Sequence, residues 1–301
     1  METEGIIVRG TGGNYVVMTD SGDEIICPAK GVFRHTGDKP CAGDRVTVLT
    51  GPGAVLKSIQ ERKNILIRPP VSNVENLFIT FAAAQPEPNL LNVDKLTCVC
   101  GHLGIKPVIV ITKTDISPDA ARKISDIYEK SGFKAFSVSP DEGADAVREY
   151  IRLSCRSGVT CFAGASGVGK STLITRLFPE LSLETGEISK KIMRGKNTTR
   201  AVELYSLRKL FGDSGGGFVA DTPGFSLLDF VRFDFLDLET LPDDFPEFSR
   251  FIGSCRYTKC THLCEDGCRI CEAAARGEIP ASRHESYVSI YGELKKKQKY
   301  R

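Results

Sequence analysis

The sequence predicts a multidomain protein in which a small all-β barrel, a central α/β domain and a short, mainly helical unit follow one another. Three observations predict this order. Short strands separated by glycine turns fill the first sixty residues, buried strands then alternate with helical segments as far as residue 232, and five cysteines crowd into seventeen residues after that. The 301 residues exceed one ordinary core, which favours two or three domains. We expect the boundaries at 1–63, 64–232 and 233–301.

The composition is typical of a globular protein outside membranes, with 41% hydrophobic and 26% charged residues. The longest apolar runs, VIVI and LFITFAAA, are too short to span a membrane, and METEGIIVRG lacks the basic start of a secretion signal. We therefore expect a cytoplasmic protein with no membrane attachment. The net charge of +2 does not indicate nucleic acid by itself. Basic residues cluster at 190–200 and at the C-terminal end, where solvated surface is the plainer alternative.

Residues 5–60 contain five short stretches with strand character, namely GIIVRG, NYVVMTD, DEIICPA, DRVTVLT and AVLKSIQ. So many short strands predict a small closed barrel of either the OB or the SH3-like type. OB barrels commonly bind oligonucleotides on one strand face. Basic side chains are available in this segment at Arg9, Lys30, Arg34, His35 and Arg45. A purely architectural barrel is the alternative.

From residue 64 the pattern changes to strands alternating with helices, which predicts an α/β domain with a mostly parallel sheet. The strands are expected at 77–84, 107–111, 159–164 and 216–221, and the helices at 89–102, 117–132 and 170–178. The helix after Ser117-Pro118 stops at Gly132. Its apolar stripe is Ala121, Ile124, Ile127 and Tyr128. A hairpin is expected around the glycines at 215–217.

A glycine-rich loop, GASGVGKS at 164–171, lies between a predicted strand and a predicted helix and matches the phosphate-binding pattern G-x-x-x-x-G-K-[ST]. In such a loop, backbone N–H groups turn toward the β-phosphate, the lysine reaches the β- and γ-phosphate oxygens, and the serine binds Mg²⁺. Lys170 and Ser171 take these two roles here. The predicted nucleotide-binding residues of the loop are Gly164, Ala165, Ser166, Gly167, Val168, Gly169, Lys170, Ser171 and Thr172.

A second polar loop, TKTD at 112–115, follows the buried strand VIVI and predicts recognition of guanine. It lies at the carboxyl end of a strand, where open α/β sheets bind ligands. The Asp115 carboxylate can accept from N1–H and the exocyclic amine of guanine. Adenine offers neither donor there, which disfavours an ATP-dependent kinase or ATPase. Thr112 stands where most such loops carry Asn and loses an amide contact. The predicted base-side residues are Thr112, Lys113, Thr114 and Asp115, with Ser137 and Val138 in the backing loop FSVS.

Asp221 ends a predicted strand in FVADTPGF, about fifty residues after the phosphate loop. There it can hold Mg²⁺ through water, and the Gly224 N–H can sense the γ-phosphate. The motifs therefore run from base reader to phosphate loop to this acidic turn, whereas in most GTPases the phosphate loop comes first. This order predicts a circularly permuted GTPase domain, because a site assembled from strand ends in space tolerates new chain ends.

The chain resembles the circularly permuted ribosome-assembly GTPases of the RsgA (YjeQ) family. The resemblance rests on the barrel, on RPPVSNVENL, ITKTD, GASGVGKST, RGKNTTR and DTPGFS, and on the cysteine cluster, which together span nearly the whole sequence. It implies an OB-type β-barrel, a circularly permuted P-loop GTPase domain and a zinc-binding C-terminal domain. It also implies a GTPase that binds the small (30S) ribosomal subunit with its 16S rRNA, assists late maturation of that subunit and is stimulated by it. We expect a monomer that binds GTP and GDP with Mg²⁺.

The cysteine cluster predicts a metal site, because thiolates and imidazole are preferred ligands of Zn²⁺ and no secretion signal suggests disulfides. Spacing alone leaves several sets of four ligands open, since Cys264 and Cys271 compete with the others. The family pattern implies one structural zinc ion held by Cys255, Cys260, His262 and Cys268.

The sequence departs from common GTPases at the group that orients the attacking water. Phe225 occupies the position where many regulatory GTPases carry Gln. The family carries a histidine before Thr-Thr in the first switch, and this chain has Asn197 there, which can hold a water but cannot act as a base. We therefore expect slow intrinsic hydrolysis, stimulated by the ribosome, with Thr198 or Thr199 reaching Mg²⁺. The alternative is an RNA-binding module that uses GTP as a switch with negligible hydrolysis.

Overall fold

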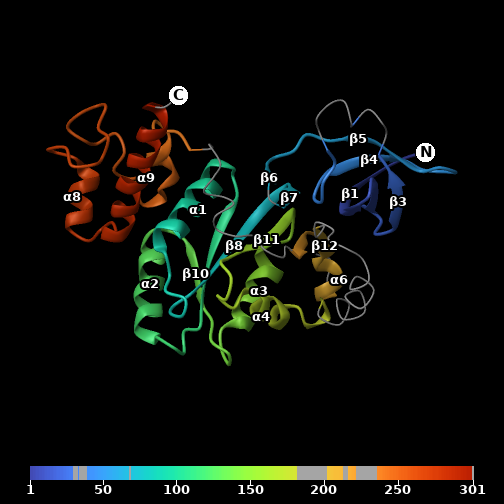
Figure 1. Cartoon of the computed structure of the whole chain (residues 1–301), viewed down its shortest axis with the longest axis horizontal. Helices are drawn as coiled ribbons and strands as arrows, with labels where there is room; N and C mark the ends of the chain where they lie inside the picture. Colours follow the sequence, from blue (N-terminus) through green and yellow to red (C-terminus); the bar gives the residue numbers. More distant parts are fainter. Residues whose placement is uncertain are drawn as a thin grey trace. The chain divides into compact units, whose positions relative to one another are not determined.

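The fold is described here from a computed structural model (Figure 1). It describes residues 1–29, 33, 39–67, 69–181, 202–212, 216–221 and 236–299. The chain divides into two compact units. Unit 1 comprises Met1–Leu77, Asp145–Phe162 and Ser171–Phe225, and unit 2 comprises Phe78–Ala144, Ala163–Lys170 and Ser226–Arg301. Each unit is therefore assembled from segments that are far apart in the sequence.

The N-terminal part of unit 1 is a five-stranded barrel. Its strands are β1 (Glu2–Thr11), β2 (Asn14–Thr19), β3 (Glu24–Pro28), β4 (Arg45–Leu49) and β5 (Val55–Ile59). β1 pairs antiparallel with β2 and β4, β2 pairs with β3, and β4 pairs with β5. A parallel bridge between Ala29 and Leu56 closes the ring from β3 to β5. This closed order, β1-β2-β3-β5-β4, is that of an OB barrel and selects it over the SH3-like alternative.

Side chains that alternate along these strands fill the barrel interior, because successive residues of a strand point to opposite faces. The buried cluster consists of Ile7, Val17, Cys27, Val46, Val48 and Leu56. After the barrel, the short strands β6 (Ile65–Ile67) and β7 (Pro70–Ser72) form an antiparallel hairpin. The peptide of Gly43 lies against Ser72 so closely that a Cβ on residue 43 would be 2.1 Å from the Ser72 carbonyl oxygen. Glycine is therefore required at this point of the barrel.

The sheet of unit 1 continues beyond the barrel. It contains β11 (Val159–Ala163), β12 (Glu203–Ser206) and β13 (Phe218–Asp221), with the helices α3 (Ala144–Ser154), α4 (Lys170–Leu177) and α6 (Leu207–Phe211). β11 and β13 are parallel, whereas β12 and β13 are antiparallel, as the predicted hairpin requires. The helix α6 inside that hairpin was not predicted, because five residues are too few to show a periodic pattern.

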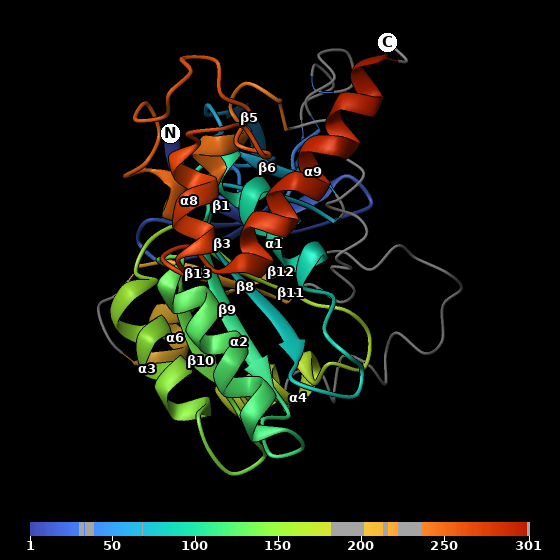
Figure 2. The same ribbon diagram turned by 90° about the vertical axis from the view of Figure 1, so that its left-hand side faces the viewer.

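Unit 2 contains the strands that carry the predicted base reader. β9 (Lys106–Thr112) pairs in parallel with β10 (Lys134–Ser137) and lies beside β8 (Val74–Ala82), which enters unit 2 at Phe78. The helices α1 (Leu90–His102) and α2 (Pro118–Lys130) pack on this part of the sheet (Figure 2). The four strands and three helices expected from sequence in the α/β region are all present. Proline at the start of α2 and Gly132 at φ 85° after its end mark the predicted limits of that helix.

The C-terminal part of unit 2 is short and mainly helical. It comprises two 3₁₀ helices, η2 (Leu241–Asp244) and η3 (Pro246–Phe248), followed by α8 (Arg269–Ala275) and α9 (Ala281–Lys299). Its core is a buried cluster to which α1 contributes Cys98. The other members are Leu241, Phe245, Phe248, Cys268, Ile270, Ala273, Ile279, Tyr287 and Ile290. No helix within the described ranges is long and apolar enough to cross a membrane.

Candidate functional site

The phosphate loop connects β11 to α4. All five residues of β11 are buried, so the strand fixes the start of the loop within the sheet. A Cβ on residue 164 would lie 2.4 Å from the Thr80 carbonyl oxygen, and Gly169 has a φ of 90°. Both positions therefore require glycine, one because of a close backbone approach and the other because of its conformation. Lys170 begins α4, and Leu173 and Leu177 anchor that helix through its buried face.

The base-reading loop begins where β9 ends, and its first residue contacts the phosphate loop. The Thr112 hydroxyl lies 3.1 Å from the Phe81 carbonyl oxygen and 2.5 Å from the Val168 carbonyl oxygen, and it can donate to either. Thr112 is 5% exposed. Thr112 lacks the amide contact that Asn makes in most such loops, but its hydroxyl forms a hydrogen bond that joins the two nucleotide-binding loops. The sequence gives no sign of this, since 56 positions separate Thr112 from Val168.

In the rest of the base reader, Lys113 and Thr114 form hydrogen bonds to backbone carbonyl oxygens, and the Asp115 carboxylate lies at the surface. Lys113 has a φ of 52° and its amine donates to the Gln85 carbonyl oxygen. The Thr114 N–H donates to the Val138 carbonyl oxygen at 3.3 Å, which fixes this loop against the backing loop that contains Ser137. Asp115 is exposed, and within the described ranges it forms no hydrogen bond or ion pair. Its carboxylate is free to accept from a ligand.

The predicted switch residues are described only in part. Asp221 is the last residue of β13 and pairs across the sheet with Glu203. Because β13 is parallel to β11, Asp221 ends its strand on the side where β11 leads into the phosphate loop. The side chain of Asp221 lies outside the described residues, as do Asn197, Thr198, Thr199, Gly224 and Phe225. Their roles in Mg²⁺ binding and hydrolysis stay predictions.

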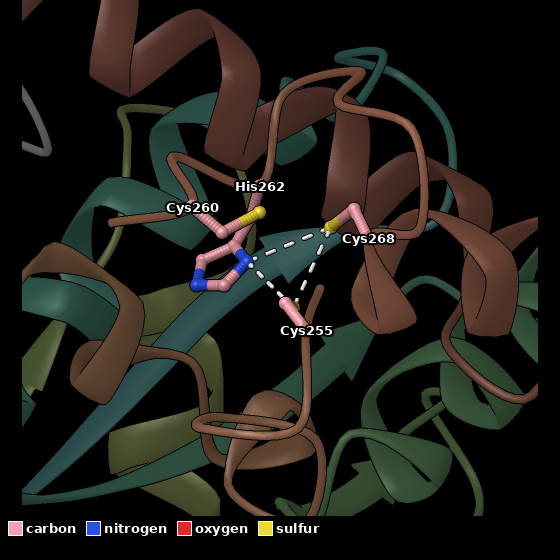
Figure 3. Close-up of side chains that lie close together, drawn as sticks. All are labelled: Cys255, Cys260, His262 and Cys268. Carbon is pink, nitrogen blue, oxygen red and sulfur yellow. Dashed lines mark hydrogen bonds between the residues drawn. The ribbon is translucent and has the colours of Figure 1, made fainter. Parts of the chain in front are cut away.

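Four sulfur and nitrogen ligand atoms converge in the C-terminal part of unit 2 (Figure 3). The ligand atoms of Cys255, Cys260, His262 and Cys268 all lie within 4.8 Å of one another. The Cys255 and Cys268 sulfurs are 4.0 Å apart, and each lies 3.6 Å from His262 Nδ1. A tetrahedral zinc ion with bonds of ~2.3 Å to sulfur and ~2.0 Å to nitrogen requires separations of about 3.5–3.8 Å. The donor atoms and their spacing therefore fit zinc.

The two competing cysteines lie outside this group of converging ligand atoms. Cys264 is exposed, and the Cys271 sulfur lies 3.7 Å from His284 Nε2 and 3.5 Å from the His262 carbonyl oxygen. Cys268 caps the N-terminus of α8, where its sulfur accepts from the Cys271 N–H at 3.5 Å. The start of α8 thus places the Cys268 sulfur in the cluster and the Cys271 sulfur beside His284.

Comparison with known proteins identifies the family. The model described as "RsgA N-terminal domain" matches residues 4–50, and the model described as "RsgA GTPase" matches residues 59–231, more than half of the chain. The chain belongs to the RsgA GTPase family. RsgA relatives match over nearly full length. The protein of Carboxydothermus hydrogenoformans is 38% identical over 297 residues, covering 97% of both chains. That of Ruminiclostridium cellulolyticum is 36% identical over 296 residues, covering 97% of this chain and 93% of its own.

Both relatives carry the name "Small ribosomal subunit biogenesis GTPase RsgA". Two solved structures share the RsgA fold at 28% identity. YjeQ from Thermotoga maritima has a TM-score of 0.79 and covers 98% of this chain and 99% of its own. YloQ, described as a circularly permuted GTPase, has a TM-score of 0.78 and covers 99% and 96%. The family, fold class and GTPase activity expected from sequence are thereby confirmed, and the family's GTP chemistry brings Mg²⁺ with the nucleotide.

A buried ion cluster that the sequence analysis missed joins the C-terminal helices of this RsgA GTPase to α1. The Arg283 guanidinium donates to Asp94 Oδ1 and to Glu247 Oε1, each at 2.6 Å, and all three side chains are at most 1% exposed. The Tyr128 hydroxyl of α2 donates to the same Asp94 oxygen at 2.9 Å. In the sequence, Arg283 looks like an ordinary surface residue of a polar helix, so no pattern reveals it.

Proposed function

We propose that this protein binds the small (30S) ribosomal subunit and assists its late maturation, hydrolysing GTP to GDP and phosphate with turnover that the subunit stimulates. The observation that carries the proposal is the contact of Thr112 with Val168, which joins a guanine-reading loop to a phosphate loop in a member of the RsgA GTPase family. The names of those relatives support the ribosomal role.

The nucleotide-binding roles are those that the sequence motifs predict, and the positions of the described loop residues support them. The Asp115 carboxylate accepts from the guanine N1–H and N2 amine, while the stem of Lys113 lies along the base. The loop from Gly164 to Gly169 donates backbone N–H groups to the β-phosphate, and Lys170 contributes its positive charge to the β- and γ-phosphate oxygens. Ser171 directly, and Asp221 through water, would hold Mg²⁺, which would neutralise charge that develops on the phosphate oxygens.

The hydrolytic step depends on residues predicted from the sequence. Asn197 holds the attacking water, Thr198 or Thr199 contacts Mg²⁺, and the Gly224 N–H donates to the γ-phosphate. Asn197 cannot remove a proton from water, so intrinsic hydrolysis is slow. Binding to the small subunit supplies or orders the missing group. GTP hydrolysis is therefore fast only when the protein is bound to the ribosomal subunit.

The four-residue metal cluster holds one structural zinc ion. Its closed set of three thiolates and one imidazole leaves no position for a substrate, and it lies in a region with a small core, where a metal ion stabilises the fold. The domains are 1–63, 64–232 and 233–301, which the matched spans 4–50 and 59–231 support. The protein is a cytoplasmic monomer whose ribosomal contact is with 16S rRNA.

The deciding experiment measures phosphate release from GTP by the purified protein, with and without small ribosomal subunits. Lys170→Ala provides the blank, and Lys130→Ala, an exposed residue in the last turn of α2, provides the matched control. We expect slow release alone, strong stimulation by subunits for the wild type and Lys130→Ala, and none for Lys170→Ala. Tight GTP binding without stimulation would instead support a nucleotide-switched RNA-binding module. Competition by ATP as effective as that by GTP would contradict the role of Asp115.

A further inference from the structure

The loop that carries two of the proposed zinc ligands, Cys260 and His262, has an unusual backbone. His262 has a φ of 60°, the left-handed region that side chains with a Cβ rarely adopt. The residue is nevertheless 6% exposed and its Nδ1 atom faces two of the cysteine sulfurs. An unfavourable conformation persists only where the surroundings hold it. The loop from Cys260 to Cys264 must therefore be held by other groups.

One carboxylate binds the N–H side of this loop. Glu265 Oε1 accepts from the Thr261 N–H at 2.8 Å and from the Thr261 hydroxyl, while Oε2 accepts from the N–H groups of Leu263 at 3.0 Å and Cys264 at 3.2 Å. Three backbone N–H groups thus surround one anionic group, on both sides of His262 in the chain. Such a concave set of N–H groups is matched to negative charge.

Two side chains of α9 bind the carbonyl side of the same loop. His284 Nε2–H donates to the His262 carbonyl oxygen at 2.8 Å, and the Tyr287 hydroxyl donates to the Thr261 carbonyl oxygen at 2.7 Å. Tyr287 is fully buried in the core of the C-terminal part. The carbonyl side therefore rests on a packed helix. On the N–H side, the Cys260 N–H donates to the Tyr257 carbonyl oxygen at 3.3 Å, and Glu265 accepts from the N–H groups that flank His262.

We propose that Glu265 is the positioning residue of the metal site, holding the loop so that Cys260 and His262 present their ligand atoms toward Cys255 and Cys268. This inference rests on the zinc site proposed above. Without the carboxylate, three N–H groups lose their acceptor and His262 is free to leave its left-handed conformation. The zinc ion would then have to order the loop itself, which weakens binding. Loss of a group that orients metal ligands typically lowers affinity 10–100-fold.

The test compares zinc release from full-length wild type, Glu265→Gln and Asp266→Asn. Asp266 is the matched control, because it is the adjacent carboxylate but is 83% exposed and pairs with the exposed Arg256. Zinc is captured by excess 4-(2-pyridylazo)resorcinol and followed by absorbance. We expect Glu265→Gln to release zinc 10–100-fold faster than the wild type, and Asp266→Asn to stay within twofold. The cobalt(II)-substituted variant should show altered d–d bands, a signature of changed ligand geometry that a general loss of stability would not produce.

GDP affinity serves as the folding control, since the phosphate loop and base reader do not contact Glu265. Glu265→Asp, which keeps the charge but shortens the side chain, should release zinc at an intermediate rate and replaces the Gln variant if that protein does not fold. Equal release rates and equal cobalt spectra in all variants would overturn the role of Glu265 while leaving the zinc site standing. Wild-type protein purified without zinc, and unable to bind it, would overturn the zinc site and this inference together.

Discussion

Replacing Arg283 by Met should destabilise the protein more than any surface charge substitution. The guanidinium is fully buried, and its two carboxylate partners, Asp94 and Glu247, are 1% and 0% exposed. Met fills much of the same volume but leaves two buried carboxylates without an opposing charge. The substitution thus removes the charge compensation while changing the packing little.

The structure sets the expected magnitude. Breaking a buried ion pair by removing one partner costs about 3–5 kcal/mol, because the remaining charge stays desolvated. Typical domains have a total stability of only ~5–15 kcal/mol. The Arg283→Met variant should therefore lie close to the limit of folding at 37 °C. Neutralising the partners as well, in Arg283→Met/Asp94→Asn/Glu247→Gln, should recover a large part of the loss.

The assay is urea unfolding of the full-length protein, followed by far-UV circular dichroism. Arg276→Met is the matched control, because Arg276 pairs with Glu278 at 2.7 Å but is 54% exposed. Exposed pairs contribute about 0–1 kcal/mol, so this variant should unfold near the wild-type midpoint. A loss below about 1 kcal/mol for Arg283→Met would refute the reasoning, as would a triple variant no more stable than the single one.

Three further predictions concern the nucleotide site and one buried carboxyl group. Asp115→Asn should lower GTP affinity by about 1–3 kcal/mol and reduce discrimination against ATP, because the carboxylate that accepts from guanine is lost; nucleotide titration checks this. Thr112→Val should weaken GTP binding by about 1 kcal/mol while Thr112→Ser retains it, since only the hydroxyl reaches Val168; equal affinities would contradict that role. Burial, with a smaller contribution from Asp243, raises the pKa of Asp244 to about 7 from 3.8. A raised carboxyl pKa means that the folded state holds the proton more tightly, so stability is lost as the pH rises from about 4 through 7. We expect about 2–3 kcal/mol of loss between pH 5 and pH 8, absent in Asp244→Asn, in melting temperatures measured at both pH values.

Local sequence patterns predict much of the fold and, within the candidate site, the phosphate loop and the base-reading loop. The buried strand before Thr112, the glycines of the phosphate loop, and the Ser117-Pro118 and Gly132 limits of α2 all depend on residues within one element or one turn. Their preferences are set by backbone sterics and by alternation of apolar side chains, which act over a few residues. The order of the motifs along the chain likewise predicted the circular permutation that YloQ shares.

Tertiary structure decided whatever depends on residues that are distant in sequence. Spacing left several sets of four metal ligands possible, and the fold brings together the ligand atoms of Cys255, Cys260, His262 and Cys268. The hydrogen bond from Thr112 to Val168 joins residues 56 positions apart in the sequence. The Arg283 cluster joins residues up to 189 positions apart. A hydrogen bond or buried charge pair requires its partners to lie close together in space. The local sequence pattern around one partner does not indicate which distant residue the other will be. The sequence by itself therefore determined the chemistry available, and the fold selected which atoms use it.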